Sequence, residues 1–276
     1  MKATFIGGGN MATALIGGML ARGAAIADLR VVEPSADARA RLTATNAGIA
    51  LFDRCTRDAV TGASLVVLAV KPQQMRDAAR ALAPSLAGTQ TPVVLSIAAG
   101  IRLADLSRWL AGHRRIVRAM PNTPALVGKG ISGVFAAPEV DETGRAVAAS
   151  VLEAAGELVW VDDEAMLDAV TGVSGSGPAY VFYFLEALEA AARDLGFAPA
   201  DARRLAYATF AGAMALAQAS PLDPAALRAQ VTSKGGTTER ALASMESAAV
   251  KAKIVAAVKA AAIWARELGD GFGGDA

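Results

Sequence analysis

The chain has 276 residues, of which 54% are apolar and 19% charged, a composition that indicates globular protein and leaves room for two domains. Its 27 basic and 26 acidic residues give a net charge of +1, and the lack of a long basic run argues against a nucleic-acid partner. One cysteine, Cys55, and one histidine, His113, exclude an intrachain disulfide and a cysteine- or histidine-based zinc site, so we predict no metal.

The N-terminal residues form a short predicted strand, 3–6, that runs directly into three glycines and an apolar helix beginning near Asn10. The spacing Gly7-x-Gly9-x-x-Ala12 fits the dinucleotide-binding fingerprint, in which the glycines permit a tight turn and close approach of a pyrophosphate. The unpaired N–H groups and dipole of the helix start would then hold the anion. The alternative is a glycine-rich turn without a ligand.

We see no signal peptide at this end, and apolar runs elsewhere are broken by charge before the ~20 residues that a bilayer requires. The sequence therefore predicts a cytoplasmic protein with no membrane partner.

Strands and helices alternate through the first half of the chain. Short apolar strands are predicted at 30–34, 64–70, 92–98, 115–120, 130–137 and 157–161, with helices at 35–46, 72–84 and 141–155. Near-continuous apolar strands between helices are typical of a mainly parallel sheet covered on both faces. We therefore predict an α/β domain over residues 1–161. His113 is expected at the surface, in a turn before a strand, with no catalytic role.

The residues after the second strand bear on the choice of cofactor. Glu33 lies where an acidic residue normally accepts a hydrogen bond from the ribose 2′-hydroxyl of NAD, and its carboxylate would repel a 2′-phosphate. Ser35, Arg39 and Arg41 follow at once and could reach a phosphate. These signals conflict, so the residues leave the choice between NADPH and NADH open.

Three later segments fall at the carboxyl ends of predicted strands, where open parallel sheets bind their ligands. They are "LAVKPQ" at 68–73, "IAAG" at 97–100 and "AMPNTP" at 119–124. The alternative for each is ordinary strand-to-helix turn chemistry, because proline suits the first turn of a helix.

From residue 162 to 276 the chain is predicted to be entirely helical. Helix 178–196 is apolar nearly all round its first turns, and helix 205–219 carries no charged residue. A helix that is apolar on every face has to be buried on every face. Either both helices are central in one bundle or a second subunit covers them, and we favour an obligate homodimer formed through this half. A higher oligomer of such dimers is compatible with the sequence.

Two glycine-rich interruptions, 171–180 and 231–242, each precede a helix in this half. The second places Thr237 and Thr238 at a helix N-terminus, which would bind an anion through backbone N–H groups and hydroxyls. The alternative is that one threonine merely caps the helix.

Taken together, "FIGGGNMA", "LAVKPQ", "SIAAG", "RAMPNTPALVGKG", "AVTGVSGSGPAYVF" and "PAALRAQVTSKGGTTERALASME" resemble the pyrroline-5-carboxylate reductases. The resemblance covers almost the whole chain in order, and the last block is the family's signature. It implies reduction of 1-pyrroline-5-carboxylate to L-proline by NAD(P)H, the final step of proline biosynthesis. It further implies a Rossmann domain, followed by an all-α domain that binds substrate and interlocks two subunits.

The resemblance also implies the site residues. Candidate cofactor contacts, including those from the strand ends, are Ile6, Gly7, Gly8, Gly9, Asn10, Met11, Glu33, Ser35, Thr56, Ala69, Val70, Lys71, Pro72, Ile97, Ala98, Ala99 and Asn122. Candidate substrate contacts are Ser233, Gly235, Gly236, Thr237 and Thr238, with Thr238 the candidate catalytic residue. NADPH is the expected cofactor with NADH as the alternative. Two departures from the family pattern bear against a preference for NADPH: Thr56 replaces an Asn of some members, and Glu33 replaces an uncharged residue.

Two rival functions are weighed against this one. A 3-hydroxyacid dehydrogenase of the same build depends on a lysine in its helical domain, but no lysine lies between Lys129 and Lys234. A dinucleotide-sensing module without catalysis would have no use for the second anion-binding loop at 233–238. A cyclic imine can arrive already protonated, so its reduction requires chiefly alignment, which can lower a barrier by ~7–11 kcal/mol.

Overall fold

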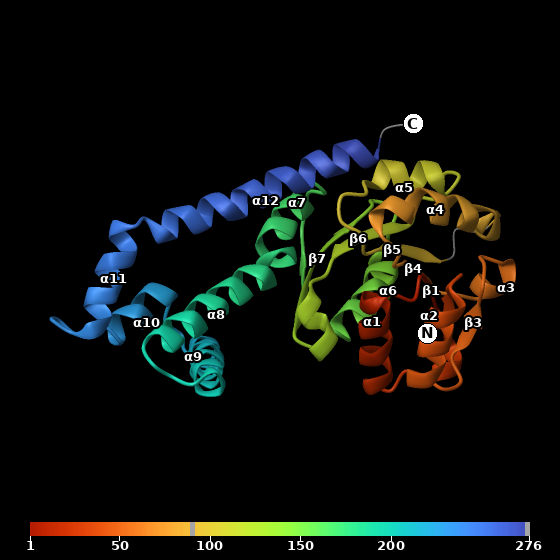
Figure 1. The fold of residues 1–276 in the computed structure, drawn as a ribbon. Coiled ribbons are helices and arrows are strands. Elements are labelled where there is room, and N and C mark those ends of the chain that lie inside the picture. The colour runs from red at the N-terminus through yellow and green to blue at the C-terminus, as the bar shows by residue number, and fades with distance from the viewer. Residues whose placement is uncertain (89–91, 274–276) are drawn as a thin grey trace. The chain divides into compact units, whose positions relative to one another are not determined.

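The computed structural model describes residues 1–88 and 92–273. Eight strands of this part form one sheet in the order β3-β2-β1-β4-β5-β6-β7-β8 (Figure 1). Their bounds are β1 (Ala3–Ile6), β2 (Leu29–Val32), β3 (Ala50–Phe52), β4 (Leu65–Leu68), β5 (Val93–Ser96), β6 (Ile116–Met120), β7 (Gly130–Ala136) and β8 (Gly156–Trp160). All neighbouring strands pair in parallel except β6 and β7, which are antiparallel. The predicted mainly parallel sheet is confirmed.

The chain divides into two compact units, Met1–Ser176 with Ala260–Ala276 (unit 1) and Gly177–Lys259 (unit 2). The boundary predicted between residues 161 and 162 falls directly after β8, the last strand. The two compact units divide later, after Ser176, and residues 260–273 belong with the sheet. We describe each unit separately.

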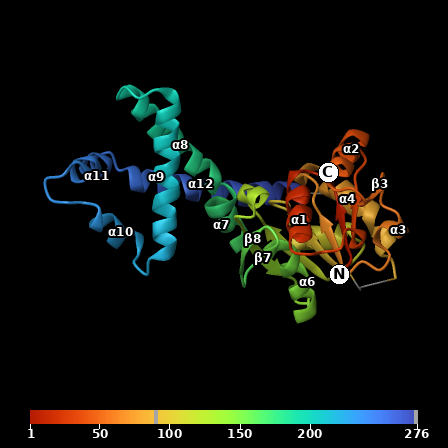
Figure 2. The ribbon, with the colours of Figure 1, turned by 90° about the horizontal axis from the view of Figure 1, so that it is seen from below.

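The helices of unit 1 cover both faces of the sheet (Figure 2). They are α1 (Asn10–Ala21), α2 (Ala36–Thr45), α3 (Arg57–Val60), α4 (Pro72–Leu86), α5 (Leu103–Trp109), α6 (Glu142–Glu153), α7 (Met166–Val170) and the final part of α12 (Val250–Phe272). Short 3₁₀ turns are η1 (Ile26–Asp28) and η2 (Thr123–Val127), and η3 (Thr171–Gly175) is one turn of π-helix.

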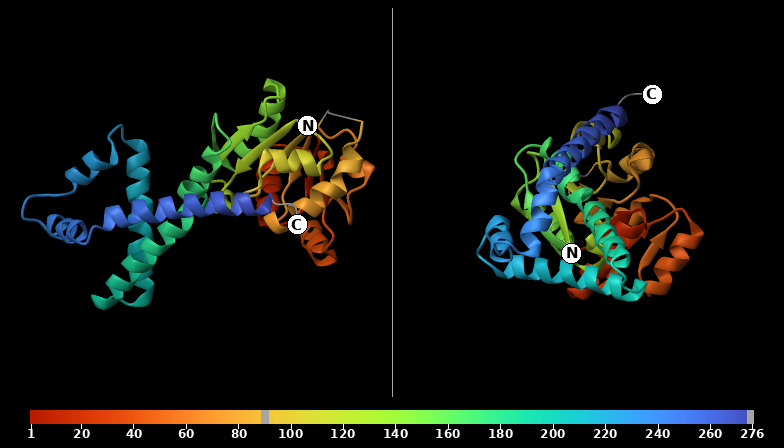
Figure 3. Two further views of the ribbon diagram at one scale, coloured as in Figure 1. Left: turned by 90° about the horizontal axis from the view of Figure 1, so that it is seen from above. Right: turned by 60° about the vertical axis from the view of Figure 1, so that its left-hand side comes forward.

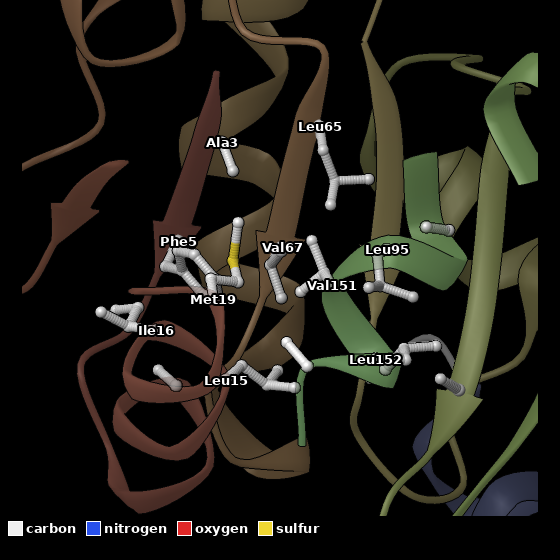
Figure 4. Close-up of a cluster of buried hydrophobic side chains, with 14 of the residues drawn as sticks. Ala3, Phe5, Leu15, Ile16, Met19, Leu65, Val67, Leu95, Val151 and Leu152 are labelled. Atoms are coloured by element: carbon white, nitrogen blue, oxygen red, sulfur yellow. The ribbon is translucent and has the colours of Figure 1, made fainter. Parts of the chain in front are cut away.

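Successive side chains of a strand point to opposite faces of the sheet, and both faces are covered, which explains why the strands are apolar throughout. Phe5 and Val67 point to the face covered by α1 and α6, where they pack with Leu15 and Val151 (Figure 4). Their chain neighbours, such as Leu68, point to the opposite face and pack with α4 and α5. Each strand therefore supplies two cores, as expected for a sheet with helices on both sides.

The prediction that His113 lies at the surface is wrong. His113 does lie in the turn before β6, but it is only 2% exposed, and its Nε2 lies 3.1 Å from the carbonyl oxygen of Pro92. Burial lowers the pKa of its imidazole below the usual 6.5, because the charged form is poorly solvated there. His113 therefore fastens the turn before β6 to the start of β5.

Unit 2 consists of helices alone in its described residues. They are α8 (Gly177–Asp194), α9 (Pro199–Ala219), α10 (Pro224–Gln230), α11 (Thr237–Ser247) and the first part of α12. Helices α8 and α9 pack against each other (Figure 3). The predicted all-α character is confirmed, and the charge-free segment 205–219 is the later part of α9.

The packing of unit 2 rules out one of the two explanations offered for its apolar helices. Only Ala202 and Ala206 of its described residues are buried, whereas Phe182, Tyr183 and Met214 are 57%, 70% and 56% exposed. A bundle of one chain with both helices at its centre is therefore excluded. None of the helices in the described part of the chain combines the length and the apolar run that crossing a membrane requires.

Candidate active site

The predicted cofactor residues of unit 1 lie in the turns that follow strands β1 to β6. Because these strands are parallel, their carboxyl ends meet at one edge of the sheet. Backbone hydrogen bonds fix neighbouring turns to one another: Gly7 N–H donates to Val32 at 2.8 Å, and Ala69 N–H donates to Ile6 at 2.8 Å. The structure thus brings the segments 6–11, 33–35, 69–72 and 97–99 to the same edge.

The glycine-rich turn between β1 and α1 has the backbone that the fingerprint requires. Gly7 has a φ of +99°, and a Cβ atom there would lie 3.0 Å from the Ala69 carbonyl oxygen, so a larger residue is excluded. Gly9 is the N-cap of α1, with no side-chain cap and no atom within 4 Å of where its Cβ would be. No side chain caps the first N–H groups of α1, and no neighbouring atom lies close to Gly9, so the turn fits a dinucleotide pyrophosphate.

The Glu33 carboxylate accepts hydrogen bonds from two backbone N–H groups at this edge. Its Oε2 accepts a hydrogen bond from Gly8 N–H and its Oε1 from Ser35 N–H, both at 2.9 Å. Arg39 donates through Nη1 to the carbonyl oxygens of Glu33 and Pro34, at 2.7 and 2.8 Å. Both carboxylate oxygens of Glu33 are thus held by backbone amides, and Arg39 is directed toward the backbone.

Other predicted cofactor residues use their side chains within the fold. The Ser35 and Thr56 hydroxyls cap α2 and α3 by accepting hydrogen bonds from Ala38 and Ala59 N–H. Asn122 is 8% exposed, donates to the Ser174 carbonyl at 3.1 Å and accepts from Ile131 N–H at 2.9 Å. The contacts of these residues with a cofactor stay predictions.

A charged cluster beneath the turn after β5 has no counterpart in the sequence analysis. Arg118, on β6 and 3% exposed, donates to Glu164 Oε1 at 2.6 Å, and the same oxygen accepts from Leu103 N–H at 2.7 Å. Burial lowers the pKa of the Arg118 guanidinium from its usual value, and Glu164 opposes that shift. Glu164 thereby holds the start of α5, and so the end of the loop that contains Ile97 to Ala99.

The predicted substrate residues lie in unit 2, in the loop between α10 and α11. Gly235 has a φ of +75°, and Gly236 N–H donates to the Ser233 carbonyl at 3.0 Å, which makes the loop a tight turn. Gly236 is the N-cap of α11, and no side chain caps the helix. The alternative in which a threonine caps this helix is therefore wrong.

Thr237 and Thr238 occupy the first two positions of α11, with Thr238 half-buried. Glu239 follows them, and its Oε2 accepts from Gly235 N–H at 2.6 Å. The sequence analysis missed Glu239. An acidic residue three positions after a helix N-cap is a known signal for a contact back to the N-cap amide, and here that contact goes one residue earlier, to Gly235. A helix start with free N–H groups and adjacent hydroxyls can bind a carboxylate and donate one further hydrogen bond.

The family comparisons match both halves of the chain. Residues 164–268 match the family model described as pyrroline-5-carboxylate reductase dimerisation, and residues 2–100 match that of the NADP oxidoreductase, coenzyme F420-dependent. The pyrroline-5-carboxylate reductase of Pseudomonas aeruginosa is 43% identical over 274 residues, covering 99% of this chain and 98% of that protein. That of Pisum sativum is 36% identical, covering 96% and 94%.

Solved structures agree with these matches. A pyrroline-5-carboxylate reductase from Coxiella burnetii superimposes with a TM-score of 0.90 at 37% identity, over 97% of this chain and 98% of that one. The pyrroline carboxylate reductase of Plasmodium falciparum, solved with NADP bound, gives a TM-score of 0.85 at 26% identity, over 98% of each chain.

Proposed function

The chain belongs to the pyrroline-5-carboxylate reductase family, and we propose that unit 1 binds its nicotinamide cofactor while the loop 233–238 of unit 2 binds its substrate. The enzyme is an oxidoreductase that reduces 1-pyrroline-5-carboxylate to L-proline in proline biosynthesis. The open helix start of α11, with two hydroxyls that do not cap it, is the observation that carries the assignment of the substrate loop.

The cofactor site follows the turns at the carboxyl edge of the sheet. Gly7 and Gly9 would hold the pyrophosphate on the N–H groups of α1, and the segments 69–72 and 97–99 would hold the nicotinamide half. NADPH is the hydride donor of the family, and Glu33 bears on how well this chain also accepts NADH. When bound, the cofactor supplies the hydride that reduces the ring carbon.

In the substrate loop, we assign the carboxylate of the substrate to the N–H groups at the start of α11. The Thr238 hydroxyl is then placed one helical position further, where it hydrogen-bonds the ring nitrogen. Because a cyclic imine can bind already protonated, no residue has to remove a proton before hydride transfer. Alignment of the ring carbon is the main contribution that the protein makes.

For the assembly, we propose a homodimer formed through unit 2. Its support is the exposed apolar surface of α8 and α9, together with the match of residues 164–268 to a dimerisation family. An oligomer of such dimers is compatible with this proposal. The cytoplasmic location and the absence of a metal stay predictions from the sequence.

One assay tests the reaction directly. NADPH and NADH oxidation should be followed side by side with pyrroline-5-carboxylate, pyrroline-2-carboxylate and a 3-oxo acid. We expect turnover with pyrroline-5-carboxylate and formation of proline. Turnover with the 3-oxo acid alone would instead support the hydroxyacid dehydrogenase, and cofactor binding without turnover would support a sensing module.

A further inference from the structure

The last turns of α12 pack directly on the loop that follows β5, and both belong to unit 1. Gly100, within this loop, has a φ of +75°, and a Cβ atom there would lie 3.3 Å from Phe272 Cδ2 and 3.4 Å from Gly269 N. A Cβ atom on Gly269 would in turn lie 3.0 Å from the Gly100 carbonyl oxygen and from Arg102 Nη2. Two facing glycines therefore allow the helix backbone to approach the loop backbone.

Charged groups reinforce this contact from both sides. Arg102 Nη1 lies 2.9 Å from Asp168 Oδ2, and its Nη2 lies 3.7 Å from Asp270 Oδ1 in the last turn of α12. The Arg102 side chain is 21% exposed and that of Asp168 10%, so this pair is partly shielded from solvent. Arg108 of α5 also donates to the Gly273 carbonyl at 2.9 Å. These contacts hold the end of α12 against residues 100–108.

A cavity of about 270 Å³ lies beside the contact, within unit 1. Pro72 and Ala99 line one side of it, and both are candidate cofactor residues. Trp264, Leu268 and Phe272 of α12 line the other. The final turns of α12 therefore face the two segments to which we assign the nicotinamide half of the cofactor.

We propose that the end of α12 positions the loop 97–100 for the nicotinamide half of the cofactor, with Gly269 and Phe272 as positioning residues. This inference rests on the proposed function, because that function assigns Ile97 to Ala99 to the cofactor. A shift of the loop by a few tenths of an ångström would then weaken cofactor binding and misalign the hydride, since about 1 Å of misplacement can cost roughly a hundredfold in rate.

The test compares two glycine-to-alanine variants on the same helix. In Gly269→Ala the new methyl group meets the Gly100 carbonyl and Arg102, whereas in Gly271→Ala nothing lies within 4 Å of it. Both changes raise helix propensity by a similar amount. We expect Gly269→Ala to raise the Kd for NADPH, measured without substrate, several-fold and up to about tenfold. Its kcat should fall and its primary deuterium isotope effect should rise, with Gly271→Ala close to the parent.

A second variant, Phe272→Ala, removes the ring that packs beside Gly100. It provides the same test, an increased Kd for NADPH, if Gly269→Ala does not fold. An unchanged Kd for NADPH and an unchanged isotope effect in a folded variant would overturn the inference. So would a lower melting temperature with unchanged binding, because that result describes a merely structural contact. If the parent did not turn over pyrroline-5-carboxylate, that result would contradict only the proposed function. The inference about α12 would still be tested, because the Kd for NADPH can be measured without turnover.

Discussion

The two units differ in how completely one chain buries its apolar residues. In unit 1 the sheet and its helices enclose two cores, with Phe5, Leu68 and Met75 fully buried. In the described part of unit 2 only two alanines are buried, although α8 and α9 are among the most apolar helices of the chain. Apolar composition alone therefore does not bury a unit: unit 1 encloses its apolar residues within its own chain, whereas unit 2 leaves large apolar side chains exposed, as is typical of an interaction surface.

The strongest way to break this comparison is to place a charge on the apolar face of unit 2. Ala213 is exposed in the single chain, so Ala213→Glu would be harmless if unit 2 stayed uncovered. In a dimer it would bury an unpaired charge, at a cost of about 3–5 kcal/mol. We expect aggregated or misfolded protein, assessed by size-exclusion chromatography and circular dichroism.

The matched control for this variant is Ala146→Glu, on an exposed position of α6 in unit 1, which should behave like the parent. A soluble, folded and active Ala213→Glu protein would show that the second half of α9 faces solvent.

Variants of Thr238 sharpen the comparison, because they test whether unit 2, the less packed unit, binds the ring nitrogen of the substrate. Thr238→Ala removes one hydrogen bond to a charged group, worth ~1.5–3 kcal/mol, so kcat/KM should fall about ten- to a hundredfold. If the bond forms mainly in the transition state, kcat should fall with it, whereas a pure binding role would raise KM.

Thr238→Ser is the control, because it keeps the hydroxyl and should retain most of the activity. Since Gly236 is the N-cap, neither variant should change thermal stability much. Parent-like kinetics for Thr238→Ala at a temperature where both proteins are folded would remove this residue from the mechanism.

Glu33 provides a smaller test on the unit 1 side. Its carboxylate occupies the Gly8 and Ser35 amides and would repel a ribose 2′-phosphate. Glu33→Ser should therefore raise the ratio of kcat/KM for NADPH to that for NADH, by about two- to fivefold for a partly exposed charge. Asp37→Ser, which removes an exposed carboxylate from the first turn of α2, should leave the ratio unchanged. An equal ratio in both variants would mean that Glu33 takes no part in cofactor choice.

The last test is a pH dependence of stability that belongs to unit 1. The pKa of His113 is lowered in the folded protein, so the unfolded chain binds the proton more readily. This contribution to stability is present above the unfolded pKa of about 6.5 and is lost as the pH falls below it. Thermal unfolding between about pH 7.5 and 5.5 should show the parent losing up to ~1.4 kcal/mol per pH unit more than His113→Gln. Parallel curves for the two proteins would contradict a buried neutral imidazole.

The sequence predicted most of unit 1 because its signals are local. Strand lengths and the turn at Gly7 follow from the spacing of apolar residues and glycines, as does the helix start at Thr237 in unit 2, and each lies within a few residues of its predicted position. The short elements β3, α3 and α5 were missed, because three to seven residues carry too little periodicity to stand out.

The missing parts of the site depend on contacts between distant segments. Arg118 with Glu164, and Gly100 with Gly269, are far apart in the chain, and no local pattern pairs them. The buried position of His113 likewise depends on Pro92, which precedes it by about twenty residues. Spacing indicated where the polar groups of the cofactor edge would gather, but not which backbone amides Glu33 would occupy.

The bare apolar faces of α8 and α9 also bear on how the chain matures. If a second copy covers them, the final step of folding is a second-order encounter, whose rate depends on how many finished chains are present. The apparent stability of unit 2 would then rise with protein concentration, while that of unit 1 would not. In a newly synthesised chain, unit 1 would then be folded while α8 and α9 of unit 2 are still exposed. The concentration of the enzyme would determine how long these apolar helices stay uncovered.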